Sequence, residues 1–145
     1  MKYFMLSLFT VLAAFLCSQA QANSDAILGK WITTDDKLIV QVYKQNDDYK
    51  AKIIWFKASD NKMNERLDEK NPDKSLRTRK WIGMDVLRNL HYDAGNKEWT
   101  DGIIYDAKHG KEWSSVAWIS NDHLLKVKGY WVLKFLSETL TFKKI

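Results

Sequence analysis

Short runs in which apolar and polar residues alternate fill most of the chain and predict antiparallel β-strands. Leu38, Val40 and Val42 alternate with polar neighbours, and the apolar residues of segment 49–55 do the same after a polar turn at residues 45–48. A two-residue period places the apolar side chains on one face of a strand and the intervening lysines on the other. The two runs therefore predict a β-hairpin with one face in water.

The same alternation resumes at Glu98 and continues to the end of the chain. The runs at residues 99–105, 111–119, 123–130 and 139–143 have strand character, and residues 106–110 and 121–122 have turn character. Successive runs joined by tight turns predict an antiparallel meander.

A polar and irregular segment separates these two blocks. Residues 58–80 are rich in Asp, Asn, Lys and Arg and contain Pro72, the only proline. We expect a long surface loop, a feature that is uncommon in compact domains and is often functional. Residues 85–90 then form a short strand or a helical turn.

The number and length of these runs favour an all-β domain. About six to eight short antiparallel strands with tight turns favour a small closed up-and-down barrel, because closure removes the exposed edges of a flat sheet. A two-layer sandwich is the alternative.

The first 22 residues have the pattern of an export signal. Lys2 precedes the apolar run 3–16, and Ala20 and Ala22 are small residues at the positions that a signal peptidase reads. The run is shorter than the roughly 20 apolar residues that span a bilayer. We therefore predict a signal peptide cleaved after Ala22 and a periplasmic or secreted domain at 23–145; an uncleaved membrane anchor is the alternative.

Composition narrows the chemistry of that domain. Cys17, the only cysteine, lies in the predicted signal peptide, which leaves no thiol for disulfides, catalysis or metal binding in residues 23–145. Loss of Lys2 lowers the net charge from +5 to +4, and the positive charges are spread along the chain. This distribution gives no support to nucleic-acid binding.

Several sequence blocks resemble known proteins. Gly29-Lys30-Trp31 resembles the opening signature of lipocalin-type barrels, in which the tryptophan closes one end of the barrel beneath a basic side chain of the last strand. Longer blocks resemble the bacterial domain-of-unknown-function 2147 family, at residues 71–79 with 82–84, 98–99 with 102–106 and 110–111, and 125–130.

This resemblance implies an exported lipocalin-like barrel domain with no assigned catalytic residue. Glu138 stands where the family usually has an arginine, which reverses a charge at the end of the barrel. We expect Lys143 or Lys144 to cover Trp31 instead.

Six residues on or near apolar strand faces are candidates for the barrel lining. These are Trp55, Trp99, Asp101, Trp113, Tyr130 and Phe142. In a wide barrel they would line a ligand cavity, and in a narrow barrel they would fill it. The two alternatives require the same residue types, so both stay open.

Asp101 is the unusual member of this set, because it shares the phase of Trp99, Ile103 and Tyr105. A carboxylate on an apolar face must be paired or hydrogen-bonded, since its burial alone is costly. It either orients a polar group of a ligand inside the barrel or turns to solvent at a bulge marked by Gly102.

A basic run in the long loop is the candidate for contact with an anion or a ligand headgroup. Lys74, Arg77, Arg79 and Lys80 follow one another without an intervening acid. Such a cluster would bind a phosphate, a lipid headgroup or an acidic partner. The alternative is an ordinary solvated loop.

No pattern indicates catalysis, a metal or a cofactor. His91, His109 and His123 are far apart in the sequence and lack the clustered spacing of zinc ligands. No serine lies in a nucleophile elbow, and no glycine-rich phosphate loop occurs. The sequence therefore favours a non-catalytic protein.

Two functions remain on this basis. The first is an exported protein that binds a small apolar or amphipathic ligand inside the barrel. The second is an envelope protein-interaction module with a filled barrel, which would act through its loops and through aromatic residues such as Trp81 and Trp131.

Overall fold

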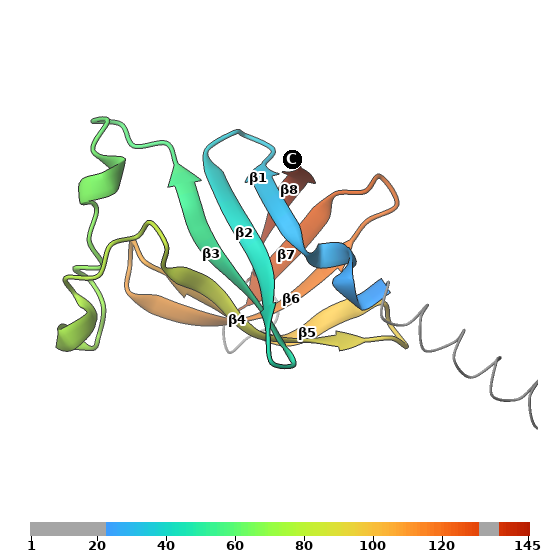
Figure 1. Ribbon diagram of the computed structural model, residues 1–145. Helices are drawn as coiled ribbons and strands as arrows, with labels where there is room; N and C mark the ends of the chain where they lie inside the picture. The colour runs from blue at the N-terminus through green and yellow to red at the C-terminus, as the bar shows by residue number, and fades with distance from the viewer. Residues whose placement is uncertain (1–22, 131–136) are drawn as a thin grey trace, which may run out of the picture.

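Eight antiparallel strands close into a barrel in the computed structural model of this chain, which describes residues 23–130 and 137–145 (Figure 1). The strands are β1 (Gly29–Thr33), β2 (Leu38–Gln45), β3 (Asp48–Phe56), β4 (Asp85–Asp93), β5 (Glu98–Asp106), β6 (Lys111–Ile119), β7 (Leu125–Tyr130) and β8 (Ser137–Lys144). Each pairs with the next, and β8 returns to pair with β1. The predicted barrel is confirmed. The predicted signal peptide and Trp131 lie outside the described residues.

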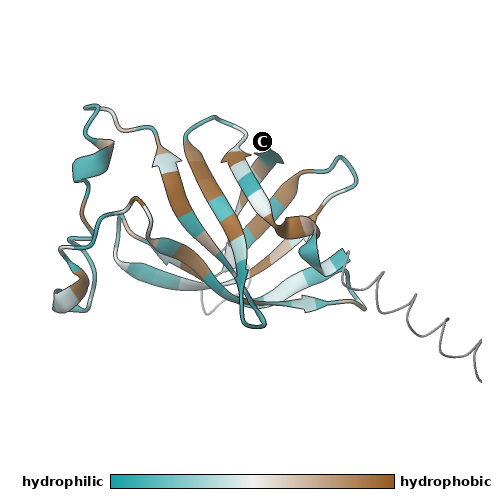
Figure 2. Ribbon diagram, viewed as in Figure 1, coloured by the Kyte–Doolittle hydropathy of each residue, from teal (hydrophilic) through white to brown (hydrophobic). Residues whose placement is uncertain are grey.

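The alternating pattern determines which side chains point into the barrel. In the β2–β3 hairpin, Val42 pairs with Ala51 and both are buried, whereas Lys50 and Lys52 lie on the outer face. Figure 2 shows the resulting bands of apolar and polar residues along the strands. The hairpin predicted from the sequence is thus present.

Among the register shifts of the barrel, a β-bulge on β3 and another on β5 change which residues of these strands face inward. On β3, Ile39 pairs with Trp55 but Val40 pairs with Ile53, so that Ile54 is an extra residue. On β5, the register shifts between Trp99 and Gly102, where Asp101 has a φ of 60°. One extra residue moves every later side chain of the strand to the opposite face.

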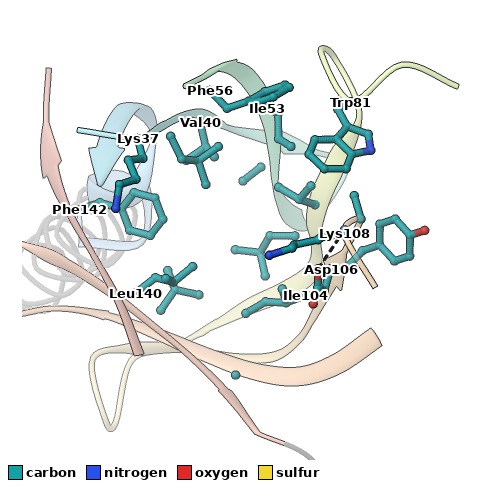
Figure 3. Close-up of a pocket in the computed structure, with 18 of the residues that line it drawn as sticks. Lys37, Val40, Ile53, Phe56, Trp81, Ile104, Asp106, Lys108, Leu140 and Phe142 are labelled. Atoms are coloured by element: carbon teal, nitrogen blue, oxygen red, sulfur yellow. Dashed lines mark hydrogen bonds between the residues drawn. The ribbon is translucent and has the colours of Figure 1, made fainter. Parts of the chain in front are cut away.

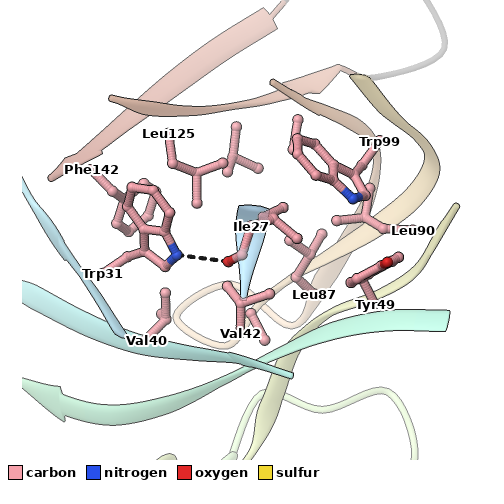
Figure 4. Close-up of a cluster of buried hydrophobic side chains, with 13 residues drawn as sticks. Ile27, Trp31, Val40, Val42, Tyr49, Leu87, Leu90, Trp99, Leu125 and Phe142 are labelled. Atoms are coloured by element: carbon pink, nitrogen blue, oxygen red, sulfur yellow. Dashed lines mark hydrogen bonds between the residues drawn. The ribbon is translucent and has the colours of Figure 1, made fainter. Parts of the chain in front are cut away.

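One end of the barrel is filled by aromatic side chains and by a short N-terminal segment. Ile27 of the 3₁₀ helix η1 (Asp25–Ile27) is completely buried among Trp31, Tyr49 and Trp99 (Figure 4). The Trp31 indole donates a hydrogen bond to the carbonyl oxygen of Ile27 at 2.8 Å, and that of Trp99 donates to the carbonyl of Ser24 at 3.1 Å. These contacts close this end.

Trp31 is covered from outside by a lysine of the last strand. The ammonium of Lys144 lies 5.1 Å from the centroid of the Trp31 ring and donates to the carbonyl of Ala26 at 3.2 Å. A cation over an indole face is attracted by the ring electrons. Lys143 instead pairs with Asp36 at 2.7 Å. The expectation that one of these two lysines covers Trp31 is confirmed for Lys144.

The long connection between β3 and β4 packs against the end of β5 and the β5–β6 turn, at one end of the barrel (Figure 1). It contains the 3₁₀ helices η2 (Met63–Glu65) and η3 (Lys74–Leu76). Gly110 in the β5–β6 turn has a φ of 65°, and a Cβ there would overlap the carbonyl oxygen of Lys70. A glycine therefore permits the close approach of this loop.

Residues 85–90 belong to strand β4, so the helical-turn alternative for them is wrong. Across residues 23–130 and 137–145, none of the helices has the length and apolar character needed to cross a membrane.

Candidate functional site

A cavity of about 740 Å³ lies within the barrel. Apolar side chains from several strands form its walls, among them Val40, Ile53, Ile104, Val127, Leu140 and Phe142 (Figure 3). The connections β1–β2, β3–β4 and β5–β6 also contribute lining residues, whereas η1 precedes β1. In an up-and-down barrel these alternate connections share one end, so the cavity lies toward the end opposite η1.

The barrel is hollow here because its inward positions carry small side chains. Ala51 and Gly129 both line the cavity, and neither reaches far toward the centre of the barrel. Leu140 is 39% exposed although it follows the inward phase of Phe142, because it faces this open space. The sequence left a filled and a hollow barrel open, and the structure contains both, one at each end.

Two of the six expected lining residues border the cavity. Trp113 on β6 and Phe142 on β8 both lie in its wall. Trp99 does not, and the expectation that it lines the cavity is wrong. It is 2% exposed in the filled end, where its ring packs 5.0 Å from Tyr92 and 6.3 Å from Tyr49 between centroids.

The two bulges remove Trp55 and Asp101 from the lining. Trp55 follows the extra residue of β3, points outward and is 36% exposed, while Phe56 takes the inward place. Asp101 is exposed, and its carboxylate accepts a hydrogen bond from the Thr100 hydroxyl at 3.1 Å. The bulge alternative for Asp101 is therefore correct, and its role inside the barrel is not supported.

Tyr130 also lies outside the cavity. Gly129 holds the inward position at the end of β7, so the next side chain points to the outer face, where Tyr130 is half-buried. Its expected place in the lining is wrong.

The basic run does not gather at the cavity. Arg79 pairs with Asp68 at 2.7 Å, and Arg77 donates from Nε to the carbonyl of Asn71 at 2.8 Å. Lys74 and Lys80 are exposed on the loop. None of the four lines the cavity, although two other residues of the same connection, Lys57 and Trp81, do. Their expected contact with a ligand headgroup is not supported.

Asp68 is the anchor of this loop, and no sequence pattern distinguished it. Its carboxylate is fully buried and accepts hydrogen bonds from Tyr105, Asn71 and Arg79 at 2.5, 2.7 and 2.7 Å. Burial acts to raise the pKa of Asp68, but these three donors outweigh it and hold the pKa below its usual value. Burial and the Asp68 carboxylate raise the pKa of Tyr105 to about 12.

Charged residues at the cavity belong to the strand connections and strand ends. Lys37, Lys57 and Lys108 contribute to the lining, together with the acidic residues Asp106 and Glu138. No sequence pattern distinguishes these lysines, because each stands alone in a different connection. The cavity therefore combines apolar walls with charged groups at one end.

Within the described ranges, no group of three or more His, Cys, Asp or Glu side chains lies close enough to hold a metal ion.

The closed eight-stranded meander, the covered tryptophan of β1 and the cavity define a lipocalin-like barrel. The chain belongs to the family described as "Uncharacterized protein conserved in bacteria (DUF2147)", whose model matches residues 29–144. It is similar to the solved structure of protein HP1028 from Helicobacter pylori, which is described as belonging to the lipocalin family. The two are 22% identical with a TM-score of 0.69, and the match covers 82% of each chain. The comparison with curated proteins found no match.

Proposed function

We propose that this protein binds a small apolar or amphipathic molecule in the barrel cavity and acts by binding rather than by catalysis. The cavity carries this proposal. Its volume of about 740 Å³ falls within the range of small-molecule sites, roughly 300–1,000 Å³, and its walls are predominantly apolar. Barrels of eight strands have an interior that can hold one small ligand.

The apolar walls favour a ligand with an alkyl or similar apolar portion. Each methylene group that moves from water into such a cavity contributes about 0.8 kcal/mol, which is about a fourfold gain in affinity. A straight-chain ligand should therefore bind more tightly with each added methylene until the cavity is full.

Export of the protein is part of this proposal. The cation, apolar run and small residues of segment 1–22 support a signal peptide, which would place the binding domain in the periplasm or outside the cell. The interaction-module alternative has less support, because a protein that acts only through its outer surface has no need of a hollow barrel.

The test compares ligand binding by two tryptophan variants, one at an inward position in the cavity wall and one at the adjacent outward position. Leu140→Trp adds a large ring to the cavity wall, and we expect it to weaken the binding of a dodecyl-chain probe at least tenfold. Thr139→Trp is the matched control, since Thr139 is exposed on the opposite face of the same strand. It should leave the affinity within about twofold. Isothermal titration calorimetry of the delipidated protein measures both.

Equal affinities for the two tryptophan variants would contradict binding in the cavity. Failure of the unmodified protein to bind any alkyl probe would contradict the proposed function itself. Thermal unfolding of both variants checks that each remains folded during the titration.

A further inference from the structure

We infer that the ligand carries an anionic headgroup, which Lys57 and Lys108 hold at the mouth of the cavity. The mouth is the end of the cavity formed by the connections β1–β2, β3–β4 and β5–β6. This inference rests on the proposed function and specifies its ligand class. It begins with the position of the cations: Lys37 lies between β1 and β2, Lys57 follows β3, and Lys108 lies between β5 and β6. All three connections lie at one end of the barrel, although they are far apart in the sequence.

The Lys108 side chain reaches toward the cavity (Figure 3), and Lys57 also contributes to the cavity lining. In Figure 3 the Lys108 side chain extends toward the space between Ile104 and Leu140, whereas the Lys37 ammonium lies beside Phe142 at the edge of the cavity. An amphiphile that places its alkyl chain among these walls would therefore have its polar end beside the ammonium groups.

The acids at the mouth do not neutralise all three lysines. Lys37 pairs with Asp35 at 2.8 Å. The Asp106 carboxylate accepts from the backbone amide of Lys108 at 3.0 Å and lies 2.6 Å from Nδ1 of His109, so it is engaged by its own turn. Glu138 is the remaining acid of the lining.

Lys57 and Lys108, unlike Lys37, have no acidic partner among the described residues. In the part of the chain that the structure describes, neither of their ammonium groups has a carboxylate within 4.0 Å. Two cations without acidic partners beside an apolar cavity favour a ligand with a negative charge over a neutral or cationic one. Carboxylates and phosphate monoesters share this chemistry.

The first experiment varies only the headgroup. Dodecanoate, dodecyl phosphate, dodecanol and dodecyltrimethylammonium are titrated into the delipidated protein by calorimetry at low salt. We expect both anions to bind at least tenfold more tightly than dodecanol, and the cation to bind more weakly than dodecanol. The anion with the higher affinity identifies a carboxylate or a phosphate as the preferred headgroup.

The second experiment removes the cations. The double variant Lys57→Gln/Lys108→Gln should bind dodecanoate about tenfold more weakly, since an exposed ion pair contributes about threefold. Its affinity for dodecanol should stay within about twofold of the unmodified protein. The preference for anions should also shrink in 0.5 M salt, because salt screens exposed charges.

A control variant separates a local effect from the net charge. Lys74→Gln/Lys80→Gln removes the same two charges from exposed positions on the outer loop. It should leave dodecanoate binding within about twofold. An equal loss in both double variants would overturn the assignment to the mouth of the cavity.

The remaining outcomes distinguish this inference from the proposed function. If dodecanol binds as tightly as the two anions, the headgroup inference is wrong and the apolar cavity site stands. If none of the four amphiphiles binds, the proposed function fails, and the inference fails with it.

Discussion

Replacement of Trp31 by alanine is expected to lower the free energy of unfolding by about 3–5 kcal/mol, as for other fully buried aromatic residues. Trp31 is 1% exposed and lies among Ile27 and Phe142 in the filled end of the barrel (Figure 4). The substitution leaves a cavity and removes the hydrogen bond to the carbonyl of Ile27. It also removes the aromatic ring that the Lys144 ammonium covers. Folded domains are stable by only about 5–15 kcal/mol, so the loss is severe.

Trp55→Ala is the control for this prediction. It removes the same side chain from an outward position that is 36% exposed, and we expect it to cost less than about 2 kcal/mol. Urea denaturation followed by circular dichroism measures both values. If Trp31→Ala costs no more than Trp55→Ala, Trp31 does not close the barrel as described.

The second large effect is expected at Asp68. Asp68→Ala should lower the free energy of unfolding by about 2–4 kcal/mol, because it leaves Tyr105, Asn71 and Arg79 without their shared acceptor. The figure lies below that for a completely buried ion pair, since the Arg79 side chain is 37% exposed.

Asp60→Ala is the matched control in the same loop. Asp60 also pairs with an arginine, Arg66, at 2.8 Å, but both side chains are more than 40% exposed. We expect this variant to cost less than about 1 kcal/mol. Similar losses in the two alanine variants, measured by urea denaturation, would show that burial of Asp68 does not matter.

Acid should abolish the stability that Asp68 contributes. Its pKa is depressed in the folded state, so the contribution is present above the unfolded pKa of about 3.9 and is lost as the pH falls through the folded value. The difference in unfolding free energy between the unmodified protein and Asp68→Asn should therefore be largest near pH 7 and shrink below about pH 4. A difference that does not change with pH would contradict this assignment.

The fold was predictable from the sequence wherever the strands keep a regular register. Val42 and Ala51 face inward as their alternation indicates, and the tight turns of the meander favour closure of the sheet. The long loop was also recognisable from its polarity, although its attachment through Asp68 was not. A buried carboxylate and an exposed one look alike in a sequence, and only the tertiary structure separates Asp68 from Asp60.

The lining was predicted less well, because a bulge reverses the inward and outward phase. Asp101 next to Gly102 gave some indication of a bulge, but nothing in the sequence around Ile54 distinguished the extra residue that turns Trp55 outward. Trp99 faces inward as its alternation indicates, but it lies in the filled end of the barrel and not at the cavity. Alternation reports the face of a strand and not the depth along the barrel axis.

The sequence pattern did not identify Lys57 and Lys108 at the cavity, for a related reason. Lys74, Arg77, Arg79 and Lys80 are close in the sequence, yet two of them serve the internal structure of the loop. Lys57 and Lys108 are distant in the sequence and both line the cavity only because alternate connections of the barrel share one end. Lysines that are neighbours in the folded barrel are therefore not the ones that are neighbours in the sequence.

Nuclear Overhauser effects between bound dodecanoate and the protein test the central claim most directly. The account predicts contacts from the alkyl chain to the methyl groups of Ile53, Val127 and Leu140, and from the headgroup end of the chain to the Lys108 side chain. Contacts confined to outer-face residues such as Ile103, or to the loop around Lys74, would contradict a ligand site inside the barrel.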